Sequence, residues 1–286
     1  MTAAPTPSLE WLAGFDDGRR WLDALPQRVD HLSRLWSFEV VGPPFDGGMC
    51  GLVLPVVAHR NGDAVLKIQF PHPECVHEAD ALRAWNGTGA VRLLDHDATN
   101  DALLLERCTP GHALASDAGA DAVAVMAELV LQLAVPSDGP FVALADEAQR
   151  WRRDLPVNWN GNEGDLVENT IELIDELVST QGPQVLVHQD LHGLNVLAAA
   201  RQPWLAIDPK PLMGELAFAL APIVRSDELG HGRAAVIDRL DALSSAVGVD
   251  RERARKWTIV QTMAWGTHLG EPIKIHLEIV RWLLDA

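Results

Sequence analysis

The chain has 286 residues, of which 48% are hydrophobic and 22% charged, and its formal net charge is -17. Such a chain can bury a sizeable core in one or two domains, and its acidity argues against a nucleic-acid partner, because phosphate binding needs a basic surface. Three cysteines without CxxC spacing indicate neither a disulfide framework nor a zinc site. The amino terminus lacks the regions of an export signal, and the apolar stretch 118–135 is interrupted by polar residues. We therefore expect a cytoplasmic protein without a membrane span.

The first hundred residues predict a helical start followed by a small antiparallel sheet. Apolar positions between Ser8 and Trp36 indicate short amphipathic helices broken at Gly14 and Pro26. Strand-like segments follow at 38–41, 52–57 and 64–68, then a helix at 77–85, then strands at 90–94 and 103–107. This β-rich region ends at 107, where we place a domain boundary.

Two features of this region bear on chemistry. The loop 45–51 contains Gly47 and Gly48, whose backbone amides could approach phosphates closely, although a plain hairpin turn explains the loop equally well. Lys67 stands inside an otherwise apolar strand, where burial is costly unless the ammonium group has a partner. The alternative is a lysine that points to solvent from a half-exposed strand.

From 108 to 286 the pattern is predominantly helical. Helices are expected at 118–135, 144–154, 163–179, 234–247, 251–268 and 273–284. Between Asp154 and Ala200 there is no Lys or Arg, while eight acidic residues lie there. Such an imbalance can attract a cationic ligand, with Glu163, Asp165 and Glu168 as candidate contacts; a solvated helix face accounts for it equally well. Trp159, Trp257 and Trp265 could line a ligand cleft, but tryptophans more often belong to the core.

The stretch from Val185 to Pro211 carries the strongest chemical signal. A short buried strand breaks into a polar loop at His188, and two further strands at 196–199 and 204–207 form a hairpin. Symmetric pairing about the connector would place Val196 opposite Ile207 and Asn195 opposite Asp208. A carboxylate and a carboxamide oxygen at one point suit Mg²⁺, which takes its other ligands from water and substrate phosphates. Asp190 remains as a separate acceptor in the same loop.

This order of groups resembles that of the kinases. His188, Asp190, Asn195 and Asp208 follow the kinase order of catalytic loop and metal-binding Asp. The variant His-x-Asp-Leu-His-x-x-Asn followed by Ile-Asp-Pro-Lys-Pro is similar to the aminoglycoside phosphotransferase family, in particular its streptomycin 6-kinase and hydroxyurea phosphotransferase branch. The resemblance covers nearly the whole chain and implies an α+β, two-lobed protein-kinase-like fold, with a small β-rich lobe at 1–107 and a larger, mainly helical lobe at 108–286.

The resemblance also implies roles for individual residues. Asp190 would be the catalytic acceptor, and Asn195 and Asp208 would hold Mg²⁺. The residues implied in nucleotide binding are Gly47, Gly48, Lys67, Glu78 as the partner of Lys67 with Glu74 as its competitor, and Glu106 and Cys108 at the crossing between the lobes. The implied activity is transfer of the γ-phosphoryl group of ATP to a hydroxyl of an aminoglycoside-like acceptor, in antibiotic resistance. A kinase for hydroxyurea or a neutral metabolite, and a nucleotide-binding pseudokinase, remain alternatives.

Three residues depart from the family pattern. Gln189 stands where the wider family often has Gly, Leu194 stands where Gly often precedes the Asn, and Ala219 replaces a common Asp. That Asp would brace the catalytic loop. Ala219 therefore predicts reduced activity, although the reacting groups themselves are unchanged.

Overall fold

The computed structural model describes residues 6–48, 50–161, 163–268 and 270–286. The fold is α+β, as expected. The chain divides into two compact units, one ending at Gly111 and one running from His112 to Ala286, and the sequence pattern places the division at 107. In the part of the chain that is described, no helix has both the length and the apolar character needed to cross a membrane.

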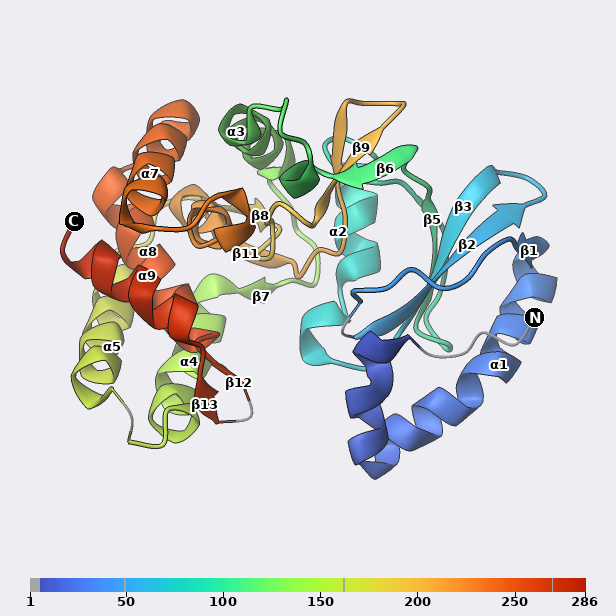
Figure 1. Cartoon of the computed structure of the whole chain (residues 1–286), viewed down its shortest axis with the longest axis horizontal. Helices are drawn as coiled ribbons and strands as arrows, with labels where there is room; N and C mark the ends of the chain where they lie inside the picture. Colours follow the sequence, from blue (N-terminus) through green and yellow to red (C-terminus); the bar gives the residue numbers. More distant parts are fainter. Residues whose placement is uncertain (1–5, 49, 162, 269) are drawn as a thin grey trace. The chain divides into compact units, whose positions relative to one another are not determined.

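The first unit is built on a five-stranded antiparallel sheet of order β1-β2-β3-β5-β4 (Figure 1). Its elements are η1 (Pro7–Gly14), α1 (Asp16–Trp36), β1 (Phe38–Val40), β2 (Gly51–Ala58), β3 (Gly62–Gln69), η2 (Pro73–Cys75), α2 (Glu78–Trp85), β4 (Leu93–Asp97) and β5 (Ala102–Glu106). Strands β2 and β3 pair over their full length, from Gly51 opposite Gln69 to Ala58 opposite Gly62. The expected sheet is thus present.

Helix α1 corrects the expectation of a break at Pro26. The helical segment does end at Gly14, but α1 then continues through Pro26 to Trp36. Trp21, Leu25, Val29 and Leu32 form its buried face and join the core of the sheet. A proline inside a helix costs roughly 3 kcal/mol, whereas burying each large apolar side chain contributes about 1.5–3 kcal/mol. Packing of the apolar face therefore outweighs the proline.

The second unit is mainly helical. Its elements are β6 (Pro110–Ala113, which spans the division), η3 (Leu114–Ser116), α3 (Ala122–Leu133), β7 (Val142–Ala143), α4 (Leu144–Asn158), α5 (Gly164–Ser179), β8 (Gln184–Val187), β9 (Val196–Ala199), β10 (Trp204–Ala206), β11 (Leu212–Glu215), η4 (Leu216–Leu220), α6 (Ala221–Val224), η5 (Asp227–Leu229), α7 (Arg233–Val247), α8 (Arg251–Ala264), β12 (Thr267–His268), β13 (Glu271–Pro272) and α9 (Lys274–Leu284). Helix α8 packs against α4, α5, α6, α7 and α9. Eight of its residues between Ala254 and Met263 are buried. It is the central helix of this unit.

Two small sheets carry the polar loop of interest. Strand β8 pairs with β11, Val187 lying opposite Leu212, and β9 pairs with β10 in a sheet of order β10-β9-β6. The hairpin register differs by one residue from the expected one, because Val196 lies opposite Ala206. The backbone N–H of Ala199 donates to the carbonyl of Pro203 at 3.2 Å. Pro203 therefore pairs with the opposite strand and is not part of the turn that connects the two strands. Ile207, not Asp208, is consequently hydrogen-bonded to Asn195, at 2.9 Å.

Candidate active site

Strand β8 ends in a tight turn that presents Asp190. The N–H of Asp190 donates to the carbonyl of His188 at 2.8 Å, and the residue between them, Gln189, has φ 63°. The Nε2 atom of His188 lies 2.9 Å from the carbonyl of Ile207. Burial lowers the pKa of His188 to about 4, so its ring is neutral at pH 7, with its proton on Nε2 facing that carbonyl. His188 therefore ties the turn to the β9–β10 hairpin.

Cations surround the carboxylate of Asp190. The ammonium group of Lys210 donates a hydrogen bond to its Oδ2, and Nη2 of Arg225 lies 3.7 Å from its Oδ1. Lys210 Nζ and the Arg225 guanidinium also lie over the ring of Trp265, at 5.9 and 4.8 Å from its centroid. This arrangement holds the carboxylate in one place and surrounds it with positive charge, which can stabilise anionic oxygens nearby.

A second layer fixes these cations. Nη1 of Arg225 lies 3.5 Å from Nε2 of His276, and Nδ1 of His276 lies 3.1 Å from the carbonyl of Trp265. Burial, aided by the charge of Arg225, lowers the pKa of His276 to about 4. The ring is thus neutral, donating from Nδ1 to the carbonyl and offering Nε2 as an acceptor to Arg225.

Glu228 stabilises the other end of the loop. Its carboxylate accepts a hydrogen bond from the N–H of Gly193 at 2.8 Å and lies 3.3 Å from Nδ1 of His192. Burial by itself would raise the pKa of Glu228, but the bonds from His192 and Gly193 lower it to about 2. The carboxylate is therefore ionised and anchors the segment between Asp190 and Asn195.

Asn195 and Asp208 remain the predicted oxygen donors for a divalent cation. Nδ2 of Asn195 donates to the backbone carbonyl of Asp190 at 3.0 Å, which turns Oδ1, the atom that a cation would bind, away from that carbonyl. Asp208 has φ 56° and follows directly on the residue that pairs with Asn195. No group of three or more His, Cys, Asp or Glu arranged for a metal occurs among the described residues. Two oxygen donors fit Mg²⁺ that takes its remaining ligands from phosphates and water.

In the first unit the expected partner of Lys67 is confirmed. Nζ of Lys67 donates to Oε2 of Glu78 at 2.6 Å, and Nε2 of Gln69 donates to the same oxygen at 2.6 Å. Lys67 is 8% exposed and Glu78 1% exposed, so this is a buried ion pair. Glu74, the competitor, lies 3.8 Å from Nδ1 of His72. The solvent-exposed alternative for Lys67 is wrong, because α2 places Glu78 beside β3.

The remaining residues implied in nucleotide binding lie in the loop between β1 and β2, at the end of β5 and just after β5. Gly47 has φ 100°, which a residue with a Cβ rarely adopts, and a Cβ on Gly48 would approach the carbonyl of Gly51 to 3.1 Å. Met49 of the same loop lies outside the described residues. At the end of β5, Oε2 of Glu106 accepts from the N–H of Arg92 at 3.0 Å, and Cys108 is a partly buried cysteine outside any disulfide. Their role in nucleotide binding stays a prediction.

Cations from other helices meet several carboxylates of the acidic stretch. Glu163 binds Arg281 of α9 at 2.8 and 2.9 Å. Asp175 pairs with Arg152 at 2.9 Å, and Glu176 with Lys256 at 2.6 Å. Asp165 and Glu168 are exposed on α5. The sequence of the stretch contains no Lys or Arg, but in the folded protein cations from other helices partly neutralise its negative charge.

Sequence reasoning missed Lys210 and Arg225 beside Asp190. Lys210 carried a signal, since it stands between two prolines directly after Asp208, the predicted metal ligand. Arg225 carried none, because its place depends on how α6 packs. Of the three tryptophans, Trp159 and Trp257 are core residues, at 1% and 0% exposure. The ring of Trp265 instead packs against the cationic groups of Lys210 and Arg225.

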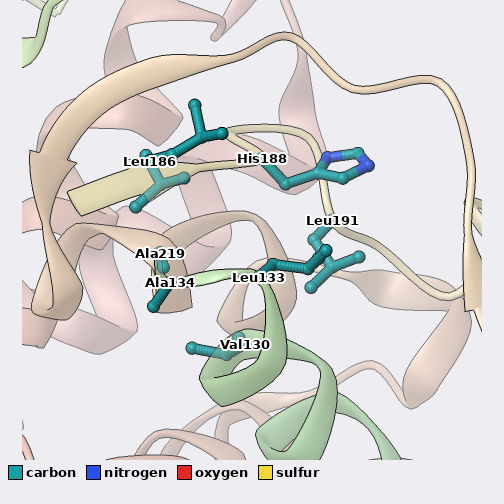
Figure 2. A pocket seen from close by; sticks show the side chains of 8 residues that line it. Val130, Leu133, Ala134, Leu186, His188, Leu191 and Ala219 are labelled. Carbon is teal, nitrogen blue, oxygen red and sulfur yellow. The ribbon is translucent and has the colours of Figure 1, made fainter. Parts of the chain in front are cut away.

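Ala219 lies in η4 and lines a small apolar cavity (Figure 2). The other lining residues are Val130, Leu133, Ala134, Leu186, Val187, His188 and Leu191. Its volume of about 10 Å³ is at the lower limit for one water molecule. The methyl group of Ala219 thus contacts the region of the catalytic loop without offering it a hydrogen bond.

Comparisons with known proteins show the family of the chain. The family model for aminoglycoside/hydroxyurea antibiotic resistance kinases matches residues 36–270. A hydroxyurea phosphotransferase of Kitasatospora aureofaciens is 38% identical over 89% of this chain and 76% of its own length. A streptomycin 6-kinase of Streptomyces glaucescens is also 38% identical, over 89% of this chain and 87% of its own length.

Solved structures confirm the fold. The choline kinase LicA of Streptococcus pneumoniae has a TM-score of 0.64 at 14% identity, covering 90% of this chain and 97% of that chain. An aminoglycoside phosphotransferase solved with ADP and hygromycin B has a TM-score of 0.59 at 12% identity, covering 90% and 95%. The expected protein-kinase-like fold is therefore correct. With the family model spanning most of the chain and relatives at 38% identity, the chain belongs to the aminoglycoside/hydroxyurea antibiotic resistance kinase family.

Proposed function

We propose that this kinase transfers the γ-phosphoryl group of ATP to a hydroxyl of an aminoglycoside-like acceptor of the streptomycin type. The observation that carries the proposal is the Asp190 carboxylate, held in a tight turn with Lys210 and Arg225 beside it. The family and the streptomycin 6-kinase relative support the choice of acceptor.

Asp190 accepts a hydrogen bond from the acceptor hydroxyl and takes its proton as the oxygen attacks the γ-phosphorus. One P–O bond forms to the acceptor oxygen, the bond between the γ-phosphorus and the β–γ bridging oxygen breaks, and ADP leaves. Lys67, oriented by Glu78, holds the phosphates. Asn195 and Asp208 would hold Mg²⁺, which would neutralise charge on the phosphate oxygens.

The test of this mechanism is Asp190→Asn. The substitution keeps the size of the side chain but removes the proton acceptor, so we expect kcat to fall by about 10²–10⁴-fold while ATP binding barely changes. The melting temperature should fall, because Lys210 and Arg225 lose the charge of their partner. The matched control is Asp238→Asn, an exposed carboxamide substitution on α7. Turnover close to that of the parent in Asp190→Asn would remove Asp190 from the mechanism.

A second acceptor, hydroxyurea, is favoured by one observation. The groups nearest the Asp190 carboxylate are cations, Lys210 and Arg225, and these would repel a cationic group of an acceptor placed beside them. A small neutral acceptor meets no such repulsion, and a hydroxyurea phosphotransferase is among the relatives.

Product identity decides between these acceptors. Streptomycin, hydroxyurea and a neutral sugar are each incubated with ATP, Mg²⁺ and protein, and phosphorylated products are identified by mass spectrometry. A cationic acceptor bound through Asp165 and Glu168 should show an apparent KM that rises with ionic strength, because exposed charges are screened over roughly 10 Å at 0.1 M salt, while kcat changes little. Asp165→Asn and Glu168→Gln should imitate added salt. Nucleotide binding without any product would favour the pseudokinase alternative.

A further inference from the structure

The peptide group between Gln189 and Asp190 is held at both of its ends. Its N–H, on Asp190, donates to the carbonyl of His188 at 2.8 Å. Its carbonyl, on Gln189, accepts from Nε2 of Gln261 at 2.9 Å, across 72 positions of sequence. Because a planar peptide group has only the two soft dihedrals on either side of it, these bonds together set the direction in which Asp190 leaves the turn.

The turn is one that a glutamine does not favour. A hydrogen bond from residue i+2 to residue i around a central residue with φ 63° defines a γ-turn of positive φ, which is rare and strained. A residue with a Cβ is disfavoured in this region, whereas Gly adopts it readily. Gln189 therefore keeps this conformation only if surrounding groups hold it there.

Gln261 is placed to hold Gln189 in this turn. It lies on the central helix α8 and is 0% exposed, and Gln189 is 2% exposed. The Gln189 carbonyl needs a donor, so the Gln261 amide must turn Nε2 toward it. The bond is shielded from water, and its loss would leave a buried carbonyl without this partner, which is unfavourable.

Ala219, the other residue that could brace this turn, offers no side-chain hydrogen bond. Ala219 of η4 contributes only a methyl group to the cavity beside His188 and Leu191. That cavity is apolar and barely large enough for one water, which would need two to four polar partners to be held. A water bridge from this direction is therefore disfavoured.

We propose that Gln261 is a positioning residue for the phosphotransfer reaction: it holds the Gln189–Asp190 peptide and so aims the Asp190 carboxylate at the acceptor hydroxyl. The inference rests on the proposed catalytic role of Asp190. It also assigns the bracing that Ala219 cannot provide to a residue of α8.

The first variant is Gln261→Met, which preserves side-chain length and removes the donor. Misplacing a catalytic group by about 1 Å can lower the rate 10²-fold, so we expect kcat to fall by about tenfold or more, with the KM for ATP essentially unchanged. The matched control is Thr262→Val on the same helix. Thr262 is 0% exposed and its hydroxyl has no hydrogen-bond partner among the described residues, so this change should leave kcat at the parental value.

A rescue separates positioning from packing. Gln189→Gly removes the conformational penalty of the turn, so we expect the double variant Gln189→Gly, Gln261→Met to recover much of the lost kcat. A packing defect in α8 would not respond to a change in the turn, and the two effects would then add. Hydrogen exchange of the peptide 185–195 should be faster in Gln261→Met and near parental in Thr262→Val.

If Gln261→Met does not fold, Gln261→Asn retains the amide and withdraws the donor by one methylene, and the same fall in kcat is expected. Parental kcat in either folded variant, or a loss that Gln189→Gly leaves unchanged, overturns the inference. Asp190→Asn separates a failure of the positioning role of Gln261 from a failure of the catalytic role of Asp190. If Asp190→Asn is inactive while the Gln261 variants keep full activity, only the positioning role fails; if Asp190→Asn keeps its turnover, the proposed function of Asp190 fails.

Discussion

The ammonium group of Lys210 donates a hydrogen bond to the carboxylate of Asp190, twenty positions earlier in the chain. A hydroxyl that is oriented by Asp190 lies within hydrogen-bond reach of the same carboxylate. With the acceptor hydroxyl bound at Asp190 as proposed, Lys210 would lie close to the oxygens of the phosphoryl group under transfer. A fixed cation at this place stabilises the charge that develops there.

Substituting Lys210 with Met should therefore lower kcat by about 10²–10³-fold, the usual effect of removing one such donor, with a smaller change in the KM for ATP. Lys256→Met is the control, because Lys256 pairs with Glu176 on the outside of α8. Steady-state kinetics of both variants check the prediction. A Lys210→Met enzyme that is faster than the parent would instead show that Lys210 blocks Asp190.

Asn195 and Asp208 should respond differently to alanine. Asp208→Ala removes a charged ligand, so we expect MgATP binding to weaken more than in Asn195→Ala. Asn195→Ala also removes the bond to the Asp190 carbonyl, so its kcat should fall by more than its ATP affinity. Titration of MgATP at several Mg²⁺ concentrations, with kcat for each variant, measures both. Parental MgATP binding in both variants would exclude these residues as the metal site.

The Lys67–Glu78 pair should matter for stability as well as for ATP. Removing one partner of a buried ion pair leaves an uncompensated charge and destabilises by about 3–5 kcal/mol. We expect that loss in Glu78→Ala, together with a raised KM for ATP, whereas Glu78→Gln should retain more stability because Gln is nearly the same size. Urea unfolding and ATP kinetics test this, with Glu74→Ala as the control. Equal effects of Glu74→Ala and Glu78→Ala would contradict it.

Stability should fall between pH 6.5 and pH 4. Burial lowers the pKa of His188 and of His276 from 6.5 to about 4. In this window the unfolded chain binds a proton at each ring and the native chain does not, so stability rises with pH and is lost as pH falls. Each histidine contributes at most about 3 kcal/mol, at 1.36 kcal/mol per pKa unit. The contribution of Glu228, with its pKa lowered to about 2, is lost only as pH falls from 4.5 through 2.

Unfolding free energies measured across this pH range check the slope. His276→Asn should make it shallower by about one proton. An unaltered slope in His276→Asn would show that His276 does not titrate in this window.

The sequence by itself determined the features that depend on local pattern. The strands around Lys67, the helix carrying Glu78, and the order His188, Asp190, Asn195, Asp208 were all readable, because strand periodicity and motif spacing are properties of short segments. The family resemblance implied Glu78 as the partner of Lys67, with Glu74 as its competitor, and the structure shows the pair with Glu78.

Only the tertiary structure decided what depends on packing between distant segments. Helix α1 runs through Pro26 because its apolar face is buried against the sheet, and the hairpin register changes because Pro203 accepts a bond within the ladder. Arg225 reaches Asp190 from α6, and Gln261 reaches the Gln189 carbonyl from α8. These contacts join residues whose separation in sequence carries no periodic signal, so burial and hydrogen-bond satisfaction in the folded unit select them.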